Sequence, residues 1–378
     1  MVSLARLFEQ CKTRIRSAIK SFLLFVSKNK LFFLFVAKRA GIALSVVFTV
    51  ISLVFIIVRL LPMTNPIFAK LALAYIQGEN PEMVLARLRP YIETYVATLK
   101  SVGIDPNASI AAQYFGYMSH VLRFDFGTSL SFQTPVWDLI STRLPYTLFT
   151  VGVALVLQFL VGIAIGMILA YKRGTKLDTA ATFALMAWRA FPDYIVGYII
   201  LFLAVVYLYH GEYLAVTGVM SPWARQEQAM HGLTLNVLCD ILQHAFWPIL
   251  AYAVVGFAGW ALAMRSSAIN VLGEDYVTVA EARGLESRRI ALTYVGRNAV
   301  LPLFTSFMIC LGYTFGGSLF IEKIFRYEGL GYTMIDALWQ GDIPLFIGCL
   351  YIEVFAIVVA VYFADVLYGL IDPRVRTS

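Results

Sequence analysis

Residues 275–302 read DYVTVAEARGLESRRIALTYVGRNAVLP and form the longest charged interruption between apolar segments in the second half of the chain. Apolar residues recur at helical spacing on both sides of Gly284: Tyr276, Val279 and Ala280 before it, and Leu285, Leu292 and Val295 after it. This pattern predicts two short amphipathic helices. Gly284 is the expected hinge between them, because glycine tolerates the positive φ that ends one helix and redirects the chain. A surface helix with an apolar stripe facing the cytoplasm has the right shape to dock into a groove on a soluble partner.

The rest of the chain is unusually apolar. Of the 378 residues, 60% are hydrophobic and only 14% are charged, and the mean hydropathy is +0.76. A soluble core does not use so many apolar residues, so we expect an all-α integral membrane protein. Six apolar segments are long enough to span a bilayer. They lie at 40–62, 146–171, 180–208, 244–271, 299–324 and 345–371.

The basic residues predict which loops face the cytosol. The loop YKRGTKLD between the second and third spans carries Lys172, Arg173 and Lys176, and the positive-inside rule places it in the cytosol. Nineteen of the 30 Lys and Arg residues fall in the segments that this assignment makes cytosolic. Both termini are then cytoplasmic, and the loops at 210–242 and 326–344 face outside.

Two further regions flank the first span. Residues 1–39 hold nine Lys or Arg residues and a single acid, Glu9, which predicts an N-terminal amphipathic extension on an anionic membrane surface. A docking arm for another subunit is the alternative for this extension. Residues 63–143 carry six basic and six acidic side chains and show helical periodicity, so they predict a large extracytoplasmic helical region.

The chain carries no recognisable catalytic motif. It contains no GxxxxGK[ST], HExxH or GxSxG sequence, so it shows no machinery to hydrolyse ATP or a peptide by itself. The four cysteines are scattered without a CxxC pair, which indicates free thiols. The four histidines are irregularly spaced, so we expect no metal site and no cofactor bound by this chain. Any energy that the protein uses must therefore come from a partner or a gradient.

Polar and small residues within the apolar segments are candidates for a pathway or gate, because polar groups in a membrane are costly. Arg189 and Asp193 flank Pro192 at i, i+4 spacing and form either a gate contact or a structural pair. Gly312, Gly316 and Gly317 follow a small-xxx-small pattern that lets helices approach closely. The full set of pathway or gate candidates is Arg189, Asp193, Gly312, Gly316, Gly317, Glu322 and Glu353. Asp365, near the end of the last span, is expected to pair with a basic group.

Several of these motifs carry a resemblance. The stretch from Asp275 resembles the coupling loop of ABC importer permeases of the dipeptide, oligopeptide and nickel branch, in which a DYV…AxA[KR]GL segment precedes an RNA…LP segment. The matching positions are Asp275, Tyr276, Val277, Ala280, Ala282, Arg283, Gly284, Leu285, Arg297, Asn298, Ala299, Leu301 and Pro302. Thr278 and Val279 replace the glutamate and first alanine of the general motif, a departure that looks usual for the peptide branch. The runs RFDFGTSL (123–130), GLG (329–331) and DPR (372–374) continue the resemblance, which covers about residues 32–376.

The resemblance implies a fold, a mechanism and partners. The fold would be a type I ABC importer transmembrane domain, with 1–39 as the extension, 40–62 as the first span, 63–143 outside, a core at 144–371 and a cytosolic tail at 372–378. The coupling loop would occupy 273–298. ATP and Mg would be bound by two ATPase subunits. The other partners would be a second permease subunit and an extracytoplasmic substrate-binding protein, with no nucleic acid. The ATPase-coupling residues would be Asp275, Tyr276, Thr278, Val279, Ala280, Glu281, Ala282, Arg283, Gly284 and Leu285.

Alternatives remain open at this stage. Within the importer hypothesis, the substrate is a di- or oligopeptide, an oligosaccharide or nickel, and no motif in the sequence separates these. A secondary transporter is expected to show repeated, broken spans with intramembrane ion ligands, and the asymmetric loop pattern argues against it. A channel needs a ring of pore-lining residues, for which one sequence offers no signal.

Overall fold

The computed structural model describes residues 30–60, 78, 80–105, 107–314 and 319–371. These residues form helices joined by turns, with one isolated antiparallel bridge between Thr128 and Pro135. The expected all-α membrane fold is confirmed. Four parts of the sequence-based hypothesis lie outside the described residues. They are the first 29 residues of the basic extension, residues 61–77 at the junction of the first span and the extracytoplasmic region, the pair Gly316 and Gly317, and the tail 372–378.

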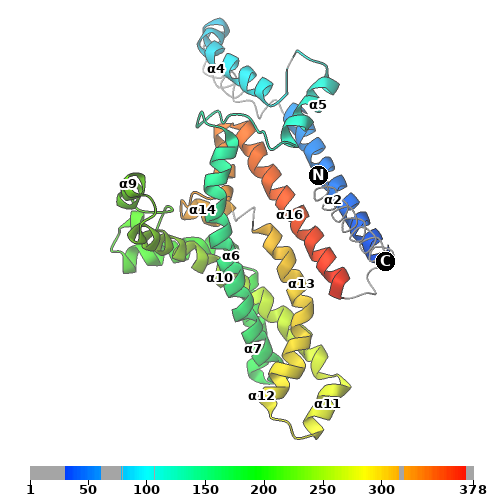
Figure 1. The fold of residues 1–378 in the computed structure, drawn as a ribbon. Helices are drawn as coiled ribbons and strands as arrows, with labels where there is room; N and C mark the ends of the chain where they lie inside the picture. Colours follow the sequence, from blue (N-terminus) through cyan, green and yellow to red (C-terminus); the bar gives the residue numbers. More distant parts are fainter. Residues whose placement is uncertain (1–29, 61–77, 79, 106, 315–318, 372–378) are drawn as a thin grey trace, which may run out of the picture.

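Five helices in the described part are long and apolar enough to cross a membrane. They are Leu31–Ile56 within α2 (Lys30–Leu60), α6 (Val136–Tyr171), α10 (Leu235–Leu272), the continuous stretch Ser287–Tyr313, and Ile343–Val366 within α16 (Ile343–Ile371). The stretch Ser287–Tyr313 comprises α12 (Ser287–Arg289), the π-helical segment η4 (Ile290–Gly296) and α13 (Arg297–Tyr313). Figure 1 shows these helices as a long, tilted bundle.

The sixth candidate span is a pair of helices with a sharp bend between them. α7 (Lys176–Arg189) and α8 (Asp193–Leu203), which π-helical η2 (Ala204–Leu208) continues, pass the same test only as a pair bent by 93°. Pro192 explains the break, since a proline disfavours helical geometry in the residue before it, and it stands as the N-cap of α8. The predicted pair lies on either side of this break, because Arg189 ends α7 and Asp193 begins α8.

Two spans differ in their bounds from the expectation. α2 begins at Lys30, so residues 30–39 belong to the first span and not to the extension. The fifth span was expected at 299–324, but its helix begins at Ser287 and ends at Tyr313. The expected partner of Asp365 is found at the start of the chain, where Arg39 Nη1 lies 3.1 Å from Asp365 Oδ2.

Glycines allow the spans to approach closely. A Cβ atom at Gly162 would lie 2.4 Å from the Cβ of Trp260, and one at Gly166 would lie 2.4 Å from the carbonyl oxygen of Ala261. These two α6 glycines are four residues apart and therefore share one helix face. Their contacts fix the long crossing of α6 and α10 seen in Figure 1. On α13, a Cβ at Gly312 would lie 2.4 Å from that of Ala360 in α16, as the small-residue pattern predicts.

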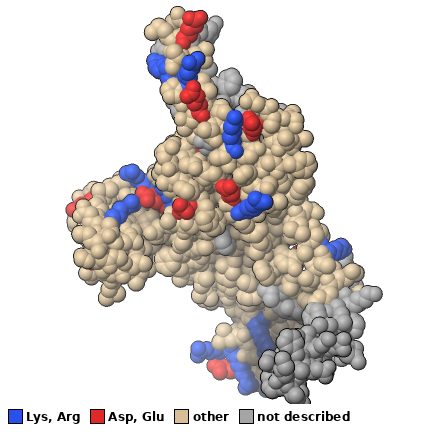
Figure 2. Space-filling view, turned by 45° about the horizontal axis from the view of Figure 1, so that its top comes forward, with Lys and Arg blue, Asp and Glu red and all other residues tan. Residues whose placement is uncertain are grey.

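The two ends of the bundle differ in charge. One end carries α4 (Pro81–Ser101), α5 (Ile110–Val121), η3 (Tyr213–Ala215), α9 (Pro222–His231), α14 (Leu319–Ile324) and α15 (Leu330–Gln340). We call it the mixed-charge end, because Figure 2 shows side chains of both signs there. The opposite end carries the 172–175 loop and α11 (Asp275–Ala282), and Figure 2 shows mostly Lys and Arg on it. We call this the basic end.

The mixed-charge end is held by a buried carboxylate. Glu322 is fully buried in α14 and accepts hydrogen bonds from the Thr147 hydroxyl (2.8 Å) and the Tyr332 amide (2.9 Å). Thr147 in turn accepts from the Leu330 amide at 2.7 Å. Gly329 is required beside them, since a Cβ there would lie 2.3 Å from the Thr147 hydroxyl. The cluster therefore ties α14 and the start of α15 to α6.

We expect Glu322→Ala to lower the melting temperature of the detergent-purified protein. It leaves the buried Thr147 hydroxyl and Tyr332 amide without their acceptor, at a cost of about 1–3 kcal/mol for each group. Glu322→Gln keeps one acceptor oxygen and should lose less. Glu328→Ala is the matched control, because Glu328 makes only a partly exposed ion pair with Arg225 and such pairs contribute about 0–1 kcal/mol. Equal melting temperatures for the two alanine variants would contradict this account of the cluster.

Candidate functional site

The helix α11 has well-defined ends at the tip of the basic end. Glu274 precedes it in extended geometry, and Asp275 lies in its first turn, where an acid interacts favourably with the helix dipole. Gly284 takes a φ of +70°, as the sequence predicts for the hinge. The Gly284 amide donates to the Glu281 carbonyl (2.9 Å) and the Leu285 amide to the Ala280 carbonyl (3.3 Å). This pair of bonds is a Schellman motif, which stops the helix and redirects the chain.

The inner face of α11 is packed on two spans. Val277 is 1% exposed and Ala280 is 2% exposed. They share a hydrophobic cluster with residues from α10, η4 and α13, including Met264, Ala268, Ile290, Val295 and Ala299. Since interiors are close-packed and transmit displacement, a force on α11 reaches α10 and the stretch Ser287–Tyr313 directly.

The outer face of α11 carries apolar side chains in the open. Tyr276 is 41% exposed and Val279 is 50% exposed. They are three residues apart and so lie on the same side of the helix, and Arg283, one turn further, is also exposed. The sequence predicts an apolar stripe of Tyr276, Val279 and Ala280. This prediction is wrong for Ala280, which belongs to the inner face. We call Tyr276 and Val279 the outer face of α11 from here on.

The remaining predicted coupling residues surround that face. Asp275, Thr278, Glu281 and Ala282 are exposed, and Leu285 is half-buried beneath the turn. The second short helix that the sequence predicts is not separate. Leu292 and Val295 lie in η4, which runs without interruption from α12 into the span, so only one free-standing surface helix is present there.

The predicted pathway or gate residues are dispersed over several elements. Arg189 and Asp193 stand on either side of the α7–α8 bend, and Glu353 is half-buried in α16. Gly312 is a helix-packing position, and Glu322 is enclosed in the cluster described above. For these last two residues the structure indicates a packing role and not a lining role.

Comparisons with known proteins place this geometry in a family. A family model described as "Binding-protein-dependent transport system inner membrane component" matches residues 162–377. The chain belongs to this family. It is therefore a transport permease, and its membrane spans agree with a multi-pass location in the cell membrane.

Curated relatives cover most of this permease. It is 31% identical over 70% of its length to an oligopeptide transport system permease protein, AppB, of Bacillus subtilis, of which it covers 80%. It is 27% identical over 90% of its length to a di/tripeptide transport system permease protein of Pseudomonas aeruginosa, and to a dipeptide transport system permease protein of Escherichia coli, covering 98% of each.

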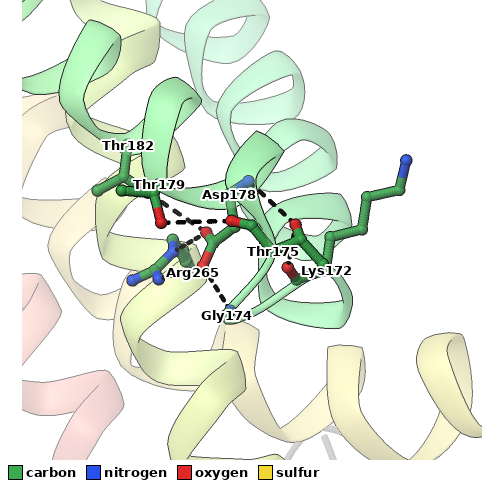
Figure 3. Close-up of polar contacts among 7 residues, drawn as sticks. All are labelled: Lys172, Gly174, Thr175, Asp178, Thr179, Thr182 and Arg265. Atoms are coloured by element: carbon green, nitrogen blue, oxygen red, sulfur yellow. Dashed lines mark hydrogen bonds and ion pairs between the residues drawn. The ribbon is translucent and has the colours of Figure 1, made fainter.

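Sequence reasoning missed one polar centre at the basic end of this permease. The Arg265 guanidinium in α10 donates two parallel hydrogen bonds to the Asp178 carboxylate in α7, of 2.6 Å from Nε and 2.7 Å from Nη2 (Figure 3). The sequence contains part of the signal, because Thr175 and Asp178 stand three residues apart at a helix start. The Thr175 hydroxyl does cap α7 by accepting from the Asp178 amide at 3.2 Å. No pattern relates these residues to Arg265, which lies 87 positions further along the chain.

Proposed function

We propose that this chain is the transmembrane subunit of an ATP-driven importer and forms half of the pathway by which di- and oligopeptides enter the cell. One observation supports peptides as the substrate class. Two relatives that align over 90% of this chain are named as dipeptide and di/tripeptide permeases. The chain itself would be non-catalytic, with ATP bound and hydrolysed by two partner ATPase subunits.

The contact with the ATPases would be the outer face of α11. Tyr276 and Val279 offer an aromatic and an aliphatic side chain on one side of a short helix, which suits insertion into an apolar groove. The inner-face residues Val277 and Ala280 attach the same helix to α10 and η4. A movement of the ATPases would then be carried into the spans, opening the pathway outward when ATP is bound and returning it inward after hydrolysis.

The charge difference between the two ends supports an orientation. Lys and Arg gather at the basic end, which includes Lys172, Arg173, Arg283, Arg288 and Arg289. By the positive-inside rule this end would face the cytosol, with both termini on that side. The mixed-charge end would then face outward, toward the binding protein. A second permease subunit would complete the pathway.

The test is the ATPase activity of the purified multi-subunit complex in lipid. Its cognate binding protein is offered peptide pools and, separately, oligosaccharide pools. We expect peptides alone to stimulate ATP hydrolysis. Stimulation by oligosaccharides alone would contradict the peptide assignment and leave the subunit role in place. A chain that purifies without any ATPase subunit would contradict the subunit role itself.

A further inference from the structure

We propose that Asp178 and Arg265 are a positioning pair that makes α7 move with α10, so that a displacement of α11 reaches the bend between α7 and α8. The inference rests on the proposed coupling role of α11. Asp178 and Arg265, which lie outside the coupling loop, transmit the motion of α11 to the bent pair of α7 and α8.

The hydrogen bonds of Asp178 and Arg265 fix the position and orientation of the two side chains relative to each other. Asp178 is buried, and its carboxylate accepts four hydrogen bonds: two from Arg265, one from the Gly174 amide (3.1 Å) and one from the Thr182 hydroxyl (3.3 Å) (Figure 3). A bidentate arginine–carboxylate contact fixes the relative orientation of its two groups as well as their distance. Gly174 reaches the carboxylate because its φ is +77°, which turns the loop between α6 and α7 inward. The bidentate contact therefore holds the start of α7 against α10.

Arg265 stands next to the part of α10 that carries α11. Its neighbour Met264 and the following turn, at Ala268, belong to the cluster that holds Val277 and Ala280. α10 ends at Leu272, and α11 begins three residues later at Asp275. A shift of α11 therefore moves the segment of α10 from which Arg265 projects.

The other end of α7 is also attached to α10. The indole Nε1 of Trp188 donates to the Val254 carbonyl at 2.8 Å. Between the two attachments, Leu185 packs in a cluster with Ala258 and Ala261. α7 is consequently held along its length, and the ion pair attaches the end that adjoins the loop to α10.

Beyond the bend, α8 contacts the mixed-charge end. A Cβ at Gly197 would lie 3.1 Å from Ile321 Cδ1 and 3.3 Å from Ile324 Cδ1, both in α14. α14 also carries Glu322 and its hydrogen bonds to α6 and α15. The bent pair of α7 and α8 therefore joins the start of α7, held against α10 at the basic end, to the cluster at the opposite end.

The experiment uses Arg265→Lys in the full multi-subunit complex in proteoliposomes. Lysine keeps the charge but lacks the planar fork that makes two parallel bonds. We measure peptide uptake, ATP hydrolysis and the amount of assembled complex for this variant, for Asp178→Asn and for the double variant. Lys176→Gln is the matched control, because Lys176 is an exposed cation at the start of α7, two residues from Asp178.

We expect Arg265→Lys to lower the peptide imported per ATP about fivefold or more, the range in which coupling between sites operates. The amount of complex should stay at the level of Lys176→Gln, and the double variant should lose no more than the more severe single variant. An unchanged ratio would overturn the inference. So would uptake and ATP hydrolysis that fall in parallel with the amount of complex, since a purely structural pair gives that result. Absence of ATP-driven uptake in the unaltered complex would instead contradict the proposed function.

Discussion

Val279→Asp is expected to abolish ATP-driven uptake while the chain still inserts into the membrane. The side chain is half exposed and lies on the outer face of α11, so a carboxylate there does not disturb the inner-face cluster of Val277 and Ala280. In the proposed complex with the ATPases the same carboxylate would be buried in an apolar groove without a partner. The cost of burying an unpaired charge makes a tenfold or greater loss of uptake the expected magnitude. Uptake by proteoliposomes, normalised to inserted protein, measures it.

Two companion variants give this experiment its control. Ser287→Asp adds the same charge in the same loop, at the exposed start of α12, where the helix dipole tolerates an acid. It should transport normally. Gly284→Pro should fail as Val279→Asp does, because proline cannot adopt a φ of +70° and loses the amide that donates to Glu281. Normal uptake by Val279→Asp would contradict the assigned role of α11.

The second large effect concerns the crossing of α6 and α10. Gly166→Ala places a methyl group 2.4 Å from the Ala261 carbonyl oxygen and 2.7 Å from the Met264 Cβ. Neither is the far end of a flexible side chain, so the helices must separate. Overpacking of this kind costs about 1–3 kcal/mol. We expect a melting temperature several degrees lower in detergent, together with lower uptake, because Met264 also belongs to the cluster beneath α11.

The same helix offers the matched control for that substitution. Among the residues that the structure describes, no atom beyond Gly152's chain neighbours and its own helix backbone lies within 4 Å of a Cβ built there. Gly152→Ala should therefore leave the melting temperature unchanged or raise it slightly, since alanine is the better helix former. Equal losses at the two positions would contradict this explanation, because the loss at Gly166 would then not come from the α6–α10 contact.

The sequence predicts most of the fold because the governing signals are local. Apolar length marks the spans, Pro192 marks the break between α7 and α8, and Gly284 marks the end of α11. The 93° angle at that break is not local, because packing of α8 on α14 and of α7 on α10 sets it. The early end of the fifth span is likewise not evident from hydropathy, since the apolar residues Leu319, Phe320 and Ile321 follow soon after Tyr313.

The candidate site was predicted in its position but not in all its contacts. Helical spacing places Tyr276, Val279 and Ala280 within one broad face, and only the neighbouring spans decide that Ala280 turns inward. The Asp178–Arg265 pair was missed because its members are far apart in sequence and each is ordinary in its own segment. Long-range side-chain pairs of this kind follow from the helix arrangement, which one sequence does not contain.

The most direct measurement is site-specific photo-crosslinking from the outer face of α11. A photoreactive phenylalanine analogue replaces Val279 in the assembled complex, and the same analogue replaces Gln226, an exposed residue of α9 at the mixed-charge end, as the control. The account predicts a covalent adduct between position 279 and an ATPase subunit, with none from position 226. An ATPase adduct from position 226, or none from position 279 in a complex that contains the ATPases, would contradict it.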